Sequence, residues 1–425
     1  MEVSCSSQLH PNFPLKNCLK EIQRSVLRRT AAEIAAAAVF EMFPQVELLG
    51  GRETTAGFSY DIYFPHPVHP DTLPLIEEKI RQIVRERRPI KTLEMVAFSA
   101  SELLKSKGHL QRAAELEGVE GLLELIQIGS FCDLCPGPHL KNTAELGAFK
   151  LLSIESLEDK VIRIQGAAAF SKPDLKDFLK KLQVYEDQSH KRLGQSAGFW
   201  TLVDGRIVWQ AFGLKLKQAV TDFLKKSFFN GFEEISGSLS WDREALHREM
   251  AAKKGFPCHL AEIWTCLNEA WDPDLGLFQS EEETHVQTSS FCKTDQLRQG
   301  IISSLQTIGK TLNILGFNYC LNLIGRKRSE KGFLVLQEAL KSLGKDGEAQ
   351  IEPEKPSQID FLIEDGVGRQ WVAASLKPSL EAKVAYFSTT SVEKITALLI
   401  ERYLLTMHSD ELIAMLTDKQ IEKPV

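Results

Sequence analysis

The stretch DLCPGPH at residues 133–139 places a thiol, Cys135, and an imidazole, His139, on either side of a Pro-Gly-Pro turn. With Cys132 included, the spacing C-x-x-C-x-x-x-H offers three ligands to zinc. A fourth ligand would have to come from elsewhere, and the two prolines restrict how the loop can surround an ion. The same residues also fit a hydrolytic site or a structural loop with an incidental thiol. We expect no metal, and the surrounding sequence must decide between the other two.

The chain has 425 residues, of which 43% are hydrophobic and 25% charged, as in a globular protein of two or three domains. No apolar run is long enough to cross a membrane and no export signal is evident, so we expect a cytoplasmic protein without a membrane partner. Eight irregularly spaced cysteines indicate reduced thiols. The net charge of -6 argues against a general nucleic-acid coat. The basic run at residues 81–91 is either a solvated helix end or a face that grips folded RNA.

The first part of the chain mixes helical and strand patterns. Apolar residues at helical spacing predict a helix over residues 15–43, which ends at Pro44. The alternation in FSYDIYF predicts a strand at residues 58–64. Before residue 170 we expect two more helices and further strands at residues 92–98, 122–129, 148–154 and 160–168. This mixture is typical of an α+β domain.

The second part begins after a helix that we expect to link two domains. A Pro-Asp pair and a narrow apolar stripe predict this single helix over residues 173–192. Residues 345–356 are the one stretch whose composition indicates a flexible loop. Between and beyond these segments the patterns predict a strand at 206–212, helices at 214–229 and 294–315, a hairpin turning at 364–368 and a last helix at 391–407.

Several stretches of the first half resemble the editing domain of threonyl-tRNA synthetase. DLCPGPH, Asn142-Thr143 and GAFKLL at residues 147–152 are similar to the family's DLCRGPH…NT…IGAFKLL. GFSYDIYF resembles the family's GFYYDF strand, and HKRLGQSAGFW at residues 190–200 resembles its linker HRKLGKELDLF. The resemblance implies an editing-type α+β domain at residues 15–170, followed by a linker helix at residues 171–197.

The second half resembles the class II synthetase core of the same family in four places. FEEISGSLSWDR at residues 232–243, AEIWTCLNEA at 261–270 and SVEKITALLIE at 391–401 are similar to the three class II motifs. IDFLIEDGVGRQW at residues 359–371 resembles the family hairpin IDFxIxDALGRxW. The resemblance implies a degenerate, shortened core at residues 198–425, built on an antiparallel sheet flanked by helices.

The residues that the family uses for threonine activation are replaced. Leu267 stands where the family has the motif-two arginine that holds the ATP α-phosphate, and Lys394 replaces the motif-three arginine that packs on the nucleotide. Ser238 replaces the motif-one proline of the family's dimer interface. The segment before Ala261 is too short to bring the zinc-binding cysteine, and Ala385 replaces a zinc-binding histidine. We therefore expect no aminoacylation and no cofactor.

The editing positions are better preserved than the synthetase positions. Arg29 and Glu33 stand where the family has the two histidines of an HxxxH motif. One helical turn separates them, so they could form an ion pair, or Glu33 could act as a base or hold water with His139. The resemblance implies candidate catalytic residues Cys135, His139, Asp133 and Glu33, and candidate contacts with the tRNA 3′ end from Arg29, Gly137 and, at a family lysine position, Arg112.

Three functions remain open at this point. The first is a paralogue unable to aminoacylate that binds tRNA, the end of an aminoacyl-tRNA or a synthetase partner. The second is a free-standing deacylase that hydrolyses a mischarged, seryl-type tRNA. The third is a structural or regulatory subunit whose class II core pairs with itself or with a complete synthetase.

Overall fold

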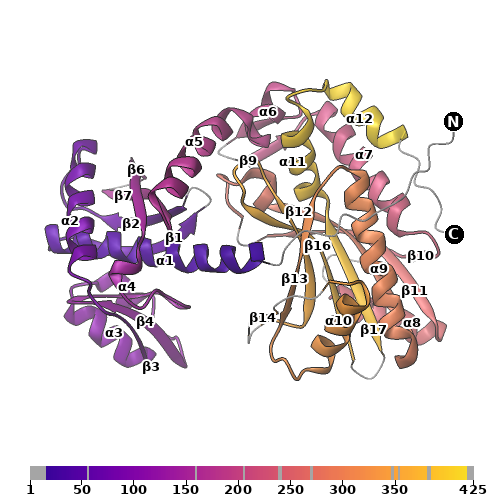
Figure 1. The fold of residues 1–425 in the computed structure, drawn as a ribbon, viewed down its shortest axis with the longest axis horizontal. Helices are drawn as coiled ribbons and strands as arrows, with labels where there is room; N and C mark the ends of the chain where they lie inside the picture. The colour runs from indigo at the N-terminus through magenta and orange to yellow at the C-terminus, as the bar shows by residue number, and fades with distance from the viewer. Residues whose placement is uncertain are drawn as a thin grey trace. The chain divides into compact units, whose positions relative to one another are not determined.

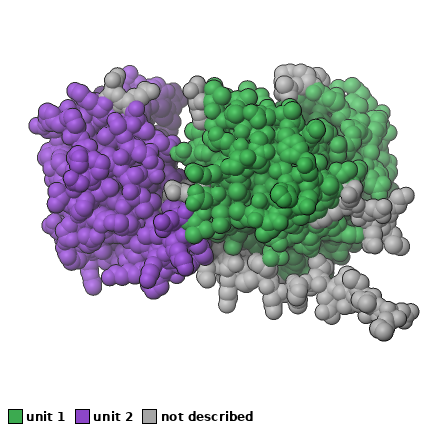
Figure 2. Space-filling view, turned by 90° about the horizontal axis from the view of Figure 1, so that it is seen from above, with its two compact units in different colours: residues 1–18, 184–425 green, residues 19–183 purple. Residues whose placement is uncertain are grey.

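The computed structural model describes residues 16–54, 57–157, 160–203, 206–237, 242–268, 271–345, 349–352, 355–380 and 384–418. The chain divides into two compact units, coloured separately in Figure 2: the N-terminal unit, residues 19–183, and the C-terminal unit, residues 184–425 with 1–18. Both units combine helices with mainly antiparallel sheets, so the predicted α+β class is confirmed. No helix in the described part of the chain is long and apolar enough to span a membrane.

The first layer of the N-terminal unit is a long helix packed on a four-stranded sheet. Helix α1 (Lys16–Met42) buries four consecutive alanines at residues 35–38, whose small side chains let the helix approach the strands closely. The antiparallel sheet has the order β1-β2-β7-β6. Its strands are β1 (Glu47–Thr54), β2 (Gly57–Tyr63), β7 (Val161–Ala169) and β6 (Ala148–Ser156). Helix α2 (Leu73–Arg85), which follows the 3-10 turn η1 (Pro70–Thr72), contacts β6.

A smaller three-stranded sheet carries the DLCPGPH stretch. Its antiparallel order is β3-β4-β5, and its own apolar core lies under α3 and α4. The last strand ends at Leu134, so Cys135 and the turn behind it leave from the end of the sheet. The elements are β3 (Ile90–Val96), α3 (Ala97–Ser106), α4 (Leu110–Ala114), β4 (Leu122–Ile128), β5 (Phe131–Leu134) and the 3-10 turn η2 (Thr143–Glu145).

The single helix predicted for residues 173–192 is wrong. Helix α5 (Lys172–Gln188) ends before Ser189, which has an extended backbone and caps α6 (His190–Ser196) by accepting a hydrogen bond from the Arg192 amide. A serine at this position therefore starts a new helix instead of continuing the old one. The chain passes from one unit to the other inside α5, between residues 183 and 184. The predicted domain division at residues 170 and 197 stays a prediction.

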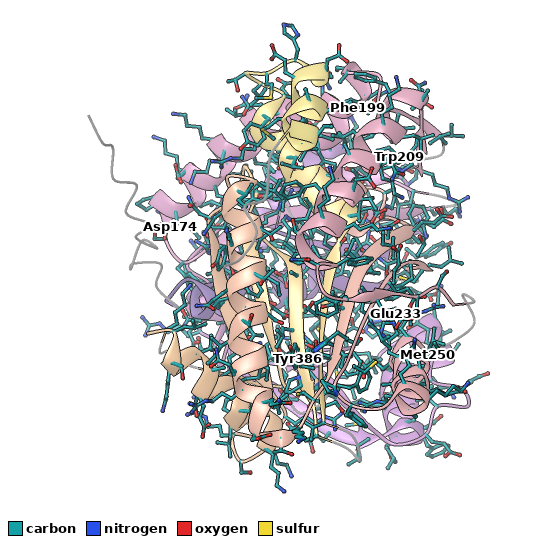
Figure 3. All side chains as sticks on the ribbon, turned by 90° about the vertical axis from the view of Figure 1, so that its right-hand side faces the viewer. Asp174, Phe199, Trp209, Glu233, Met250 and Tyr386 are labelled. Carbon is teal, nitrogen blue, oxygen red and sulfur yellow. The ribbon has the colours of Figure 1, made fainter. Side chains whose placement is uncertain are left out.

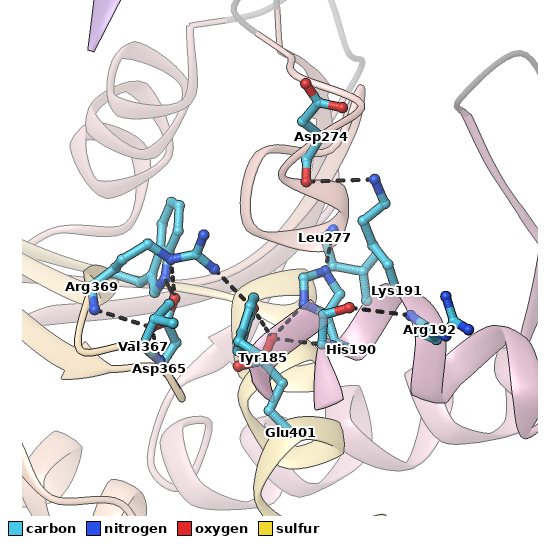
Figure 4. Close-up of polar contacts among 12 residues, drawn as sticks. Tyr185, His190, Lys191, Arg192, Asp274, Leu277, Asp365, Val367, Arg369 and Glu401 are labelled. Atoms are coloured by element: carbon cyan, nitrogen blue, oxygen red, sulfur yellow. Dashed lines mark hydrogen bonds and ion pairs between the residues drawn. The ribbon is translucent and has the colours of Figure 1, made fainter. Parts of the chain in front are cut away.

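The end of α5 and the start of α6 are fixed by a buried polar network within the C-terminal unit (Figure 4). The Tyr185 hydroxyl donates to Glu401, and His190 donates from Nδ1 to the same carboxylate at 2.8 Å. The other imidazole nitrogen, Nε2, accepts a hydrogen bond from the Leu277 amide at 3.0 Å, which places the donated ring proton on Nδ1. Arg369 donates to the Tyr185 hydroxyl and to Asp365, which extends the network to the turn at residues 365–369.

The C-terminal unit is built on an eight-stranded sheet of order β10-β11-β12-β17-β16-β15-β13-β14 (Figure 1). The two outermost pairs, β10–β11 and β13–β14, are parallel and the other pairs are antiparallel. Its strands are β10 (Glu233–Glu234), β11 (Cys258–Leu267), β12 (Glu282–Phe291), β17 (Ala385–Ser391), β16 (Gln370–Ser379), β15 (Gln358–Glu364), β13 (Tyr319–Gly325) and β14 (Gln350–Ile351).

Most helices cover one face of this sheet, whereas the other face carries polar residues and a smaller apolar cluster that includes Phe291 and Phe387. Alternate residues of β12 show the division, because Val286 belongs to the large apolar core under the helices while Gln287 lines a cavity on the opposite face. The helices on the large apolar core are α7 (Ala211–Phe228), α9 (Thr294–Ile314), α10 (Lys331–Ser342), α11 (Val392–Tyr403) and α12 (Ser409–Asp418). The unit also contains helix α8 (Arg243–Lys254), a hairpin of β8 (Trp200–Val203) and β9 (Arg206–Trp209), and the 3-10 turn η3 (Gly276–Gln279).

Two further predictions need correction. The last helix ends at Tyr403 and not at residue 407, and α12 follows it. The strand predicted to reach residue 212 stops at Trp209, because α7 begins at Ala211. Of the predicted loop, residues 346–348 and 353–354 lie outside the described part, while Gln350 and Ile351 pair with β13 as a short strand.

Candidate functional site

The predicted editing residues converge in the N-terminal unit. Arg29 and Glu33 come from α1, Arg112 from α4 and Asp133 from β5, and the loop after β5 brings Cys135, Gly137 and His139 to the same place. A β-carbon on Gly137 would lie 2.2 Å from Arg29 Nη1, which places α1 directly against the loop. The main-chain amide of Leu140 donates to the Thr30 hydroxyl at 3.0 Å and ties the end of the loop to the same helix.

Asp133 is the buried anchor of the site. Its carboxylate is fully buried and accepts hydrogen bonds from Arg112 Nε at 3.0 Å and from the Tyr60 hydroxyl. Arg112 also donates to the Leu134 carbonyl at 2.7 Å and to Glu115 at 2.6 Å. All three guanidinium nitrogens are therefore used inside the protein. Contact between Arg112 and an RNA end stays a prediction and would require one of these bonds to be exchanged.

Glu33 is fully buried, and neither carboxylate oxygen has a hydrogen-bond partner in the described part of the chain. The ion pair considered between Arg29 and Glu33 is therefore not formed. Burial raises the pKa of the Glu33 carboxyl well above its ordinary value, and the negative charge of Asp133 adds to the effect. The carboxyl consequently keeps its proton to a higher pH than an exposed glutamate does.

Arg29 differs from Arg112 because its guanidinium is half-buried and has no hydrogen-bond or ion-pair partner among the described residues. It lies against Gly137, whose φ of +104° and missing side chain make room for it. The Gly137 amide donates to Glu124 at 2.9 Å, which fixes the turn on which the guanidinium rests. Helix α1 therefore places the unpaired guanidinium of Arg29 beside the fixed backbone of the loop.

The imidazole of His139 forms a hydrogen bond through only one of its two ring nitrogens among the described residues. Its Nε2 lies 3.1 Å from the Cys135 carbonyl and donates to it, which leaves Nδ1 unprotonated and, among the described residues, without a partner. Burial lowers the pKa of His139, and Arg29 lowers it further against the opposing effect of the carbonyl. The imidazole is therefore neutral at pH 7.

The two cysteines of the stretch are not arranged as metal ligands or as nucleophiles. Cys132 packs in the small core with Ala100 and Leu104, and burial raises its pKa to about 11. Burial also raises the pKa of the Cys135 thiol, and the nearby Glu33 raises it more. Within the described ranges no three His, Cys, Asp or Glu side chains lie close enough together to hold a metal ion.

Sequence reasoning missed three residues of this site. Tyr60 binds Asp133, and Glu124 holds the Gly137 amide. Gly51 on β1 is paired with Tyr60, and a β-carbon there would lie 2.6 Å from the Tyr60 ring and 3.1 Å from Glu33 Oε1. The signal was the Gly50-Gly51 pair inside a strand, because glycine in a strand often marks a close approach of other atoms.

The three altered synthetase positions belong to the C-terminal unit. Leu267 is 74% exposed at the end of β11, where it lines two cavities of about 600 and 640 Å³. Lys394 on α11 lines the second cavity and forms an ion pair with Glu283 at 3.3 Å. Ser238 lies outside the described residues.

The cations around these two cavities are already neutralised. Arg243 pairs with Glu262 at 2.8 Å, and Lys377 pairs with Glu244, just as Lys394 pairs with Glu283. Cys266 and His285 lie 3.5 Å apart on the sheet, and burial followed by the charge of Lys394 lowers the pKa of His285 to about 4. With Leu267 in place of an arginine, the described lining offers no unpaired cation to a triphosphate.

Comparison with known proteins finds a matching family model and relatives that cover most of the chain. The family model described as the threonyl and alanyl tRNA synthetase second additional domain matches residues 123–165, which include β5 and the loop after it. A threonine–tRNA ligase of Lawsonia intracellularis is 31% identical, with 83% of this chain and 64% of that protein covered. The corresponding ligase of Laribacter hongkongensis is 25% identical over 83% of this chain and 65% of its own length, and that of Dehalococcoides mccartyi is 26% identical over 83% and 71%.

The chain thus spans about two thirds of the length of these relatives. Among solved structures, the RNA binding domain of threonyl-tRNA synthetase from Cryptosporidium parvum aligns with a TM-score of 0.45 and 16% identity over 50% of this chain and 72% of that one. Prolyl-tRNA synthetase of Giardia lamblia aligns with a TM-score of 0.39 and 10% identity over 51% and 52%. Scores this low add no argument about function.

Proposed function

This chain belongs to the threonyl-tRNA synthetase family, and we propose that it binds the 3′ end of a tRNA at residues 135–139 without hydrolysing an aminoacyl ester there. The unpaired Arg29 guanidinium beside Gly137 is the observation that carries the proposal. A planar fork of donors matches phosphate oxygens, and the fixed turn next to it limits which part of an RNA can approach.

Hydrolysis is not part of the proposal because two of the nearby acid–base groups, Glu33 and Cys135, are unsuited to activating water. Glu33 is fully buried and its raised pKa favours the protonated form, which cannot take a proton from water. The raised pKa of Cys135 keeps that thiol protonated as well. In the family the two histidines of the HxxxH motif take part in this step, and here Arg29 and Glu33 stand in their places.

Loss of amino-acid activation is also part of the proposal. The cavities beside Leu267 are lined by cations that already pair with carboxylates, so a nucleotide triphosphate would meet few free donors there. Pairing with a second copy or with a complete synthetase would be an additional assembly. Light scattering of the purified protein, alone and mixed with such a synthetase, tests it.

A deacylase is the second candidate, and one observation favours it. A buried carboxyl with a raised pKa, Glu33, lies beside Cys135, whose carbonyl holds the neutral imidazole of His139, and perturbed groups of this kind are enriched at catalytic sites. In that case His139 Nδ1 would accept the proton of the attacking water and Glu33 would donate one to the leaving ribose oxygen. The substrate would be a mischarged, seryl-type tRNA.

Binding and hydrolysis measured side by side distinguish the two functions. Seryl-tRNA and threonyl-tRNA, both on the threonine acceptor, are incubated with the wild-type chain, with Cys135→Ala and with Glu33→Gln. The proposal predicts binding of both tRNAs and ester half-lives equal to those in buffer alone. Hydrolysis of the seryl ester that disappears in Glu33→Gln would establish the deacylase instead.

A further inference from the structure

A cavity of the C-terminal unit lies on the side of the sheet covered by α7 and α9, away from Leu267. Its volume is about 1170 Å³, and it is lined by α7, α9, the end of α12 and the strands β11, β12 and β17. Thr288 and Ser290 of β12 face it, whereas Gln287, next to Thr288, faces the opposite side. Figure 3 labels Tyr386, which lies on β17 beside α9 and forms part of the lining. We call this cavity the hydroxyl groove.

Hydroxyl side chains dominate the groove, since ten of its twenty-two lining residues are Ser, Thr or Tyr. Several of these hydroxyls donate their hydrogen bond to a backbone carbonyl of their own helix. Ser227 donates to the Phe223 carbonyl at 2.8 Å, and Thr307 and Thr311 donate to the carbonyls one turn before them at 2.9 and 2.8 Å. Their oxygens are therefore left as acceptors, which suit a ligand that carries hydroxyl donors of its own.

The groove is positively charged in a chain whose net charge is -6. Lys226 on α7 and Lys310 on α9 are exposed and have no hydrogen-bond or ion-pair partner among the described residues. A third lysine, Lys225, pairs with Glu234, and the single carboxylate of the lining, Asp222, accepts a hydrogen bond from Gln218. Two unpaired ammonium groups on facing helices therefore suit an anionic ligand.

Aromatic rings lie at the end of the groove near the turn after α7. Phe229 and Phe232 are half-buried, and Phe232 meets His259 edge-on with ring centres 5.5 Å apart. Burial lowers the pKa of His259, so this ring is neutral at pH 7 and acts as a flat surface. Rings beside a basic groove are the surfaces on which bases of single-stranded nucleic acids stack.

We infer that the hydroxyl groove binds a short stretch of single-stranded RNA. Its phosphates pair with Lys226 and Lys310, its ribose hydroxyls donate to Thr307 and Thr311, and a base stacks on Phe229 or Phe232. The volume exceeds the roughly 300–1,000 Å³ of a small-molecule site, which favours a strand over one nucleotide. The inference rests on the proposed function, because it adds a second RNA contact in the other unit.

Fluorescence anisotropy of the full chain with a labelled single-stranded RNA of about six nucleotides tests the inference. A 3′-phosphate on this RNA prevents it from imitating a tRNA end. The double variant Lys226→Glu/Lys310→Glu should weaken binding at least about tenfold and flatten its salt dependence. The control variant Lys215→Glu/Lys331→Glu makes the same charge change at two exposed lysines outside the lining and should stay within about twofold of wild type.

The role of the hydroxyls is tested by Thr307→Val/Thr311→Val, which keeps the side-chain shape. Wild type should bind the RNA more tightly than DNA of the same sequence, and this variant should lose the preference because 2′-hydroxyls no longer find acceptors. Equal melting temperatures of all variants establish that each is folded. Failure of adenosine monophosphate to compete at the concentration of the RNA supports a strand, and full competition would replace the inference with a mononucleotide site.

Three other results would overturn the inference. The first is unchanged RNA binding by Lys226→Glu/Lys310→Glu. The second is dissociation of a dimer by that variant in light scattering, which would make the groove a contact between two copies. The third is loss of this RNA's binding in Arg29→Gln, which would place the RNA at residues 135–139. The last result would leave the proposed function standing, so the two proposals fail separately.

Discussion

Two glutamates, Glu33 in the N-terminal unit and Glu262 in the C-terminal unit, are almost equally buried but have opposite surroundings. Glu262 is 1% exposed and accepts hydrogen bonds from the Gly237 amide at 2.9 Å, from Arg243 at 2.8 Å and from His247 at 3.1 Å. Glu33 is 0% exposed, and in the described ranges neither of its oxygens has a partner at ordinary hydrogen-bond geometry; the weak donor that lies beside it is the Cys135 thiol.

Glu262 is a structural carboxylate, whereas the contacts within the fold do not explain why Glu33 is buried. Buried polar and charged groups are ordinarily hydrogen-bonded, because leaving one without a partner costs about 1–3 kcal/mol or more. Glu262 follows this rule and joins β11 to α8. Glu33 is an exception to this rule, and it lies on the same helix as Arg29, which also lacks a partner among the described residues. Polar groups without hydrogen bonds that gather at one place are typical of a binding site.

The largest effect is expected from Glu262→Ala. The change removes the carboxylate that Arg243 and His247 bind inside the protein, so the free energy of unfolding should fall by about 3–5 kcal/mol in a denaturant titration. Glu282→Ala, an exposed glutamate on the neighbouring strand, should change it by less than about 0.5 kcal/mol. Equal effects of the two variants would mean that the Glu262 contacts contribute no specific stability.

A clash at Gly51 should come next in size. An added β-carbon would meet the fully buried Tyr60 ring at 2.6 Å, so Gly51→Ala should lower the free energy of unfolding by about 1–3 kcal/mol. Gly118→Ala adds the same methyl group in open space, where only its φ of +80° adds a cost of about 1 kcal/mol. If Gly51→Ala were no more harmful than this control, the packing around Glu33 would be looser than described.

Glu33→Gln should have the opposite sign to Glu262→Ala. At pH 8 it removes the cost of keeping an isolated buried carboxyl protonated, so stability should rise by on the order of 1 kcal/mol. The folded pKa of Glu33 is raised, so the folded state binds more protons and wild-type stability falls as pH rises above about 4.5. Unfolding titrations from pH 4 to pH 8 should show this decline in wild type and less of it in Glu33→Gln. A loss of stability in the variant at pH 8 would reveal a partner for Glu33.

His109 should give the smallest effect. The ring is fully buried, neither nitrogen has a partner among the described residues, and burial lowers its pKa. The unfolded state therefore binds more protons just below pH 6.5, and stability should fall as pH drops through this range. In His109→Leu, thermal unfolding between pH 5 and pH 7 should show a shallower decline than in wild type. A decline of equal slope would assign the effect to other groups.

The sequence predicted those features that depend on neighbouring residues. The alanine-rich run before Pro44 predicted α1 to within a residue or two, and the motif at residues 133–139 brought its loop to α1 through the family resemblance. Features that depend on tertiary contacts were not predictable. The bond from Tyr60 to Asp133 joins residues 73 positions apart, and the isolation of Glu33 is a property of everything packed around it. Ser189 was missed because a capping serine resembles any polar residue inside an amphipathic stripe.

The most direct test of the central claim compares tRNA with an intact 3′ end and the same tRNA without its terminal adenosine. Affinity for the wild-type chain and for Arg29→Gln is measured by filter binding at fixed salt, since phosphate contacts depend on ionic strength. The account predicts that wild type prefers the intact end by about tenfold and that Arg29→Gln removes the preference while binding the shortened tRNA as before. Equal affinity of the wild-type chain for both tRNAs would contradict the claim that residues 135–139 hold a tRNA end.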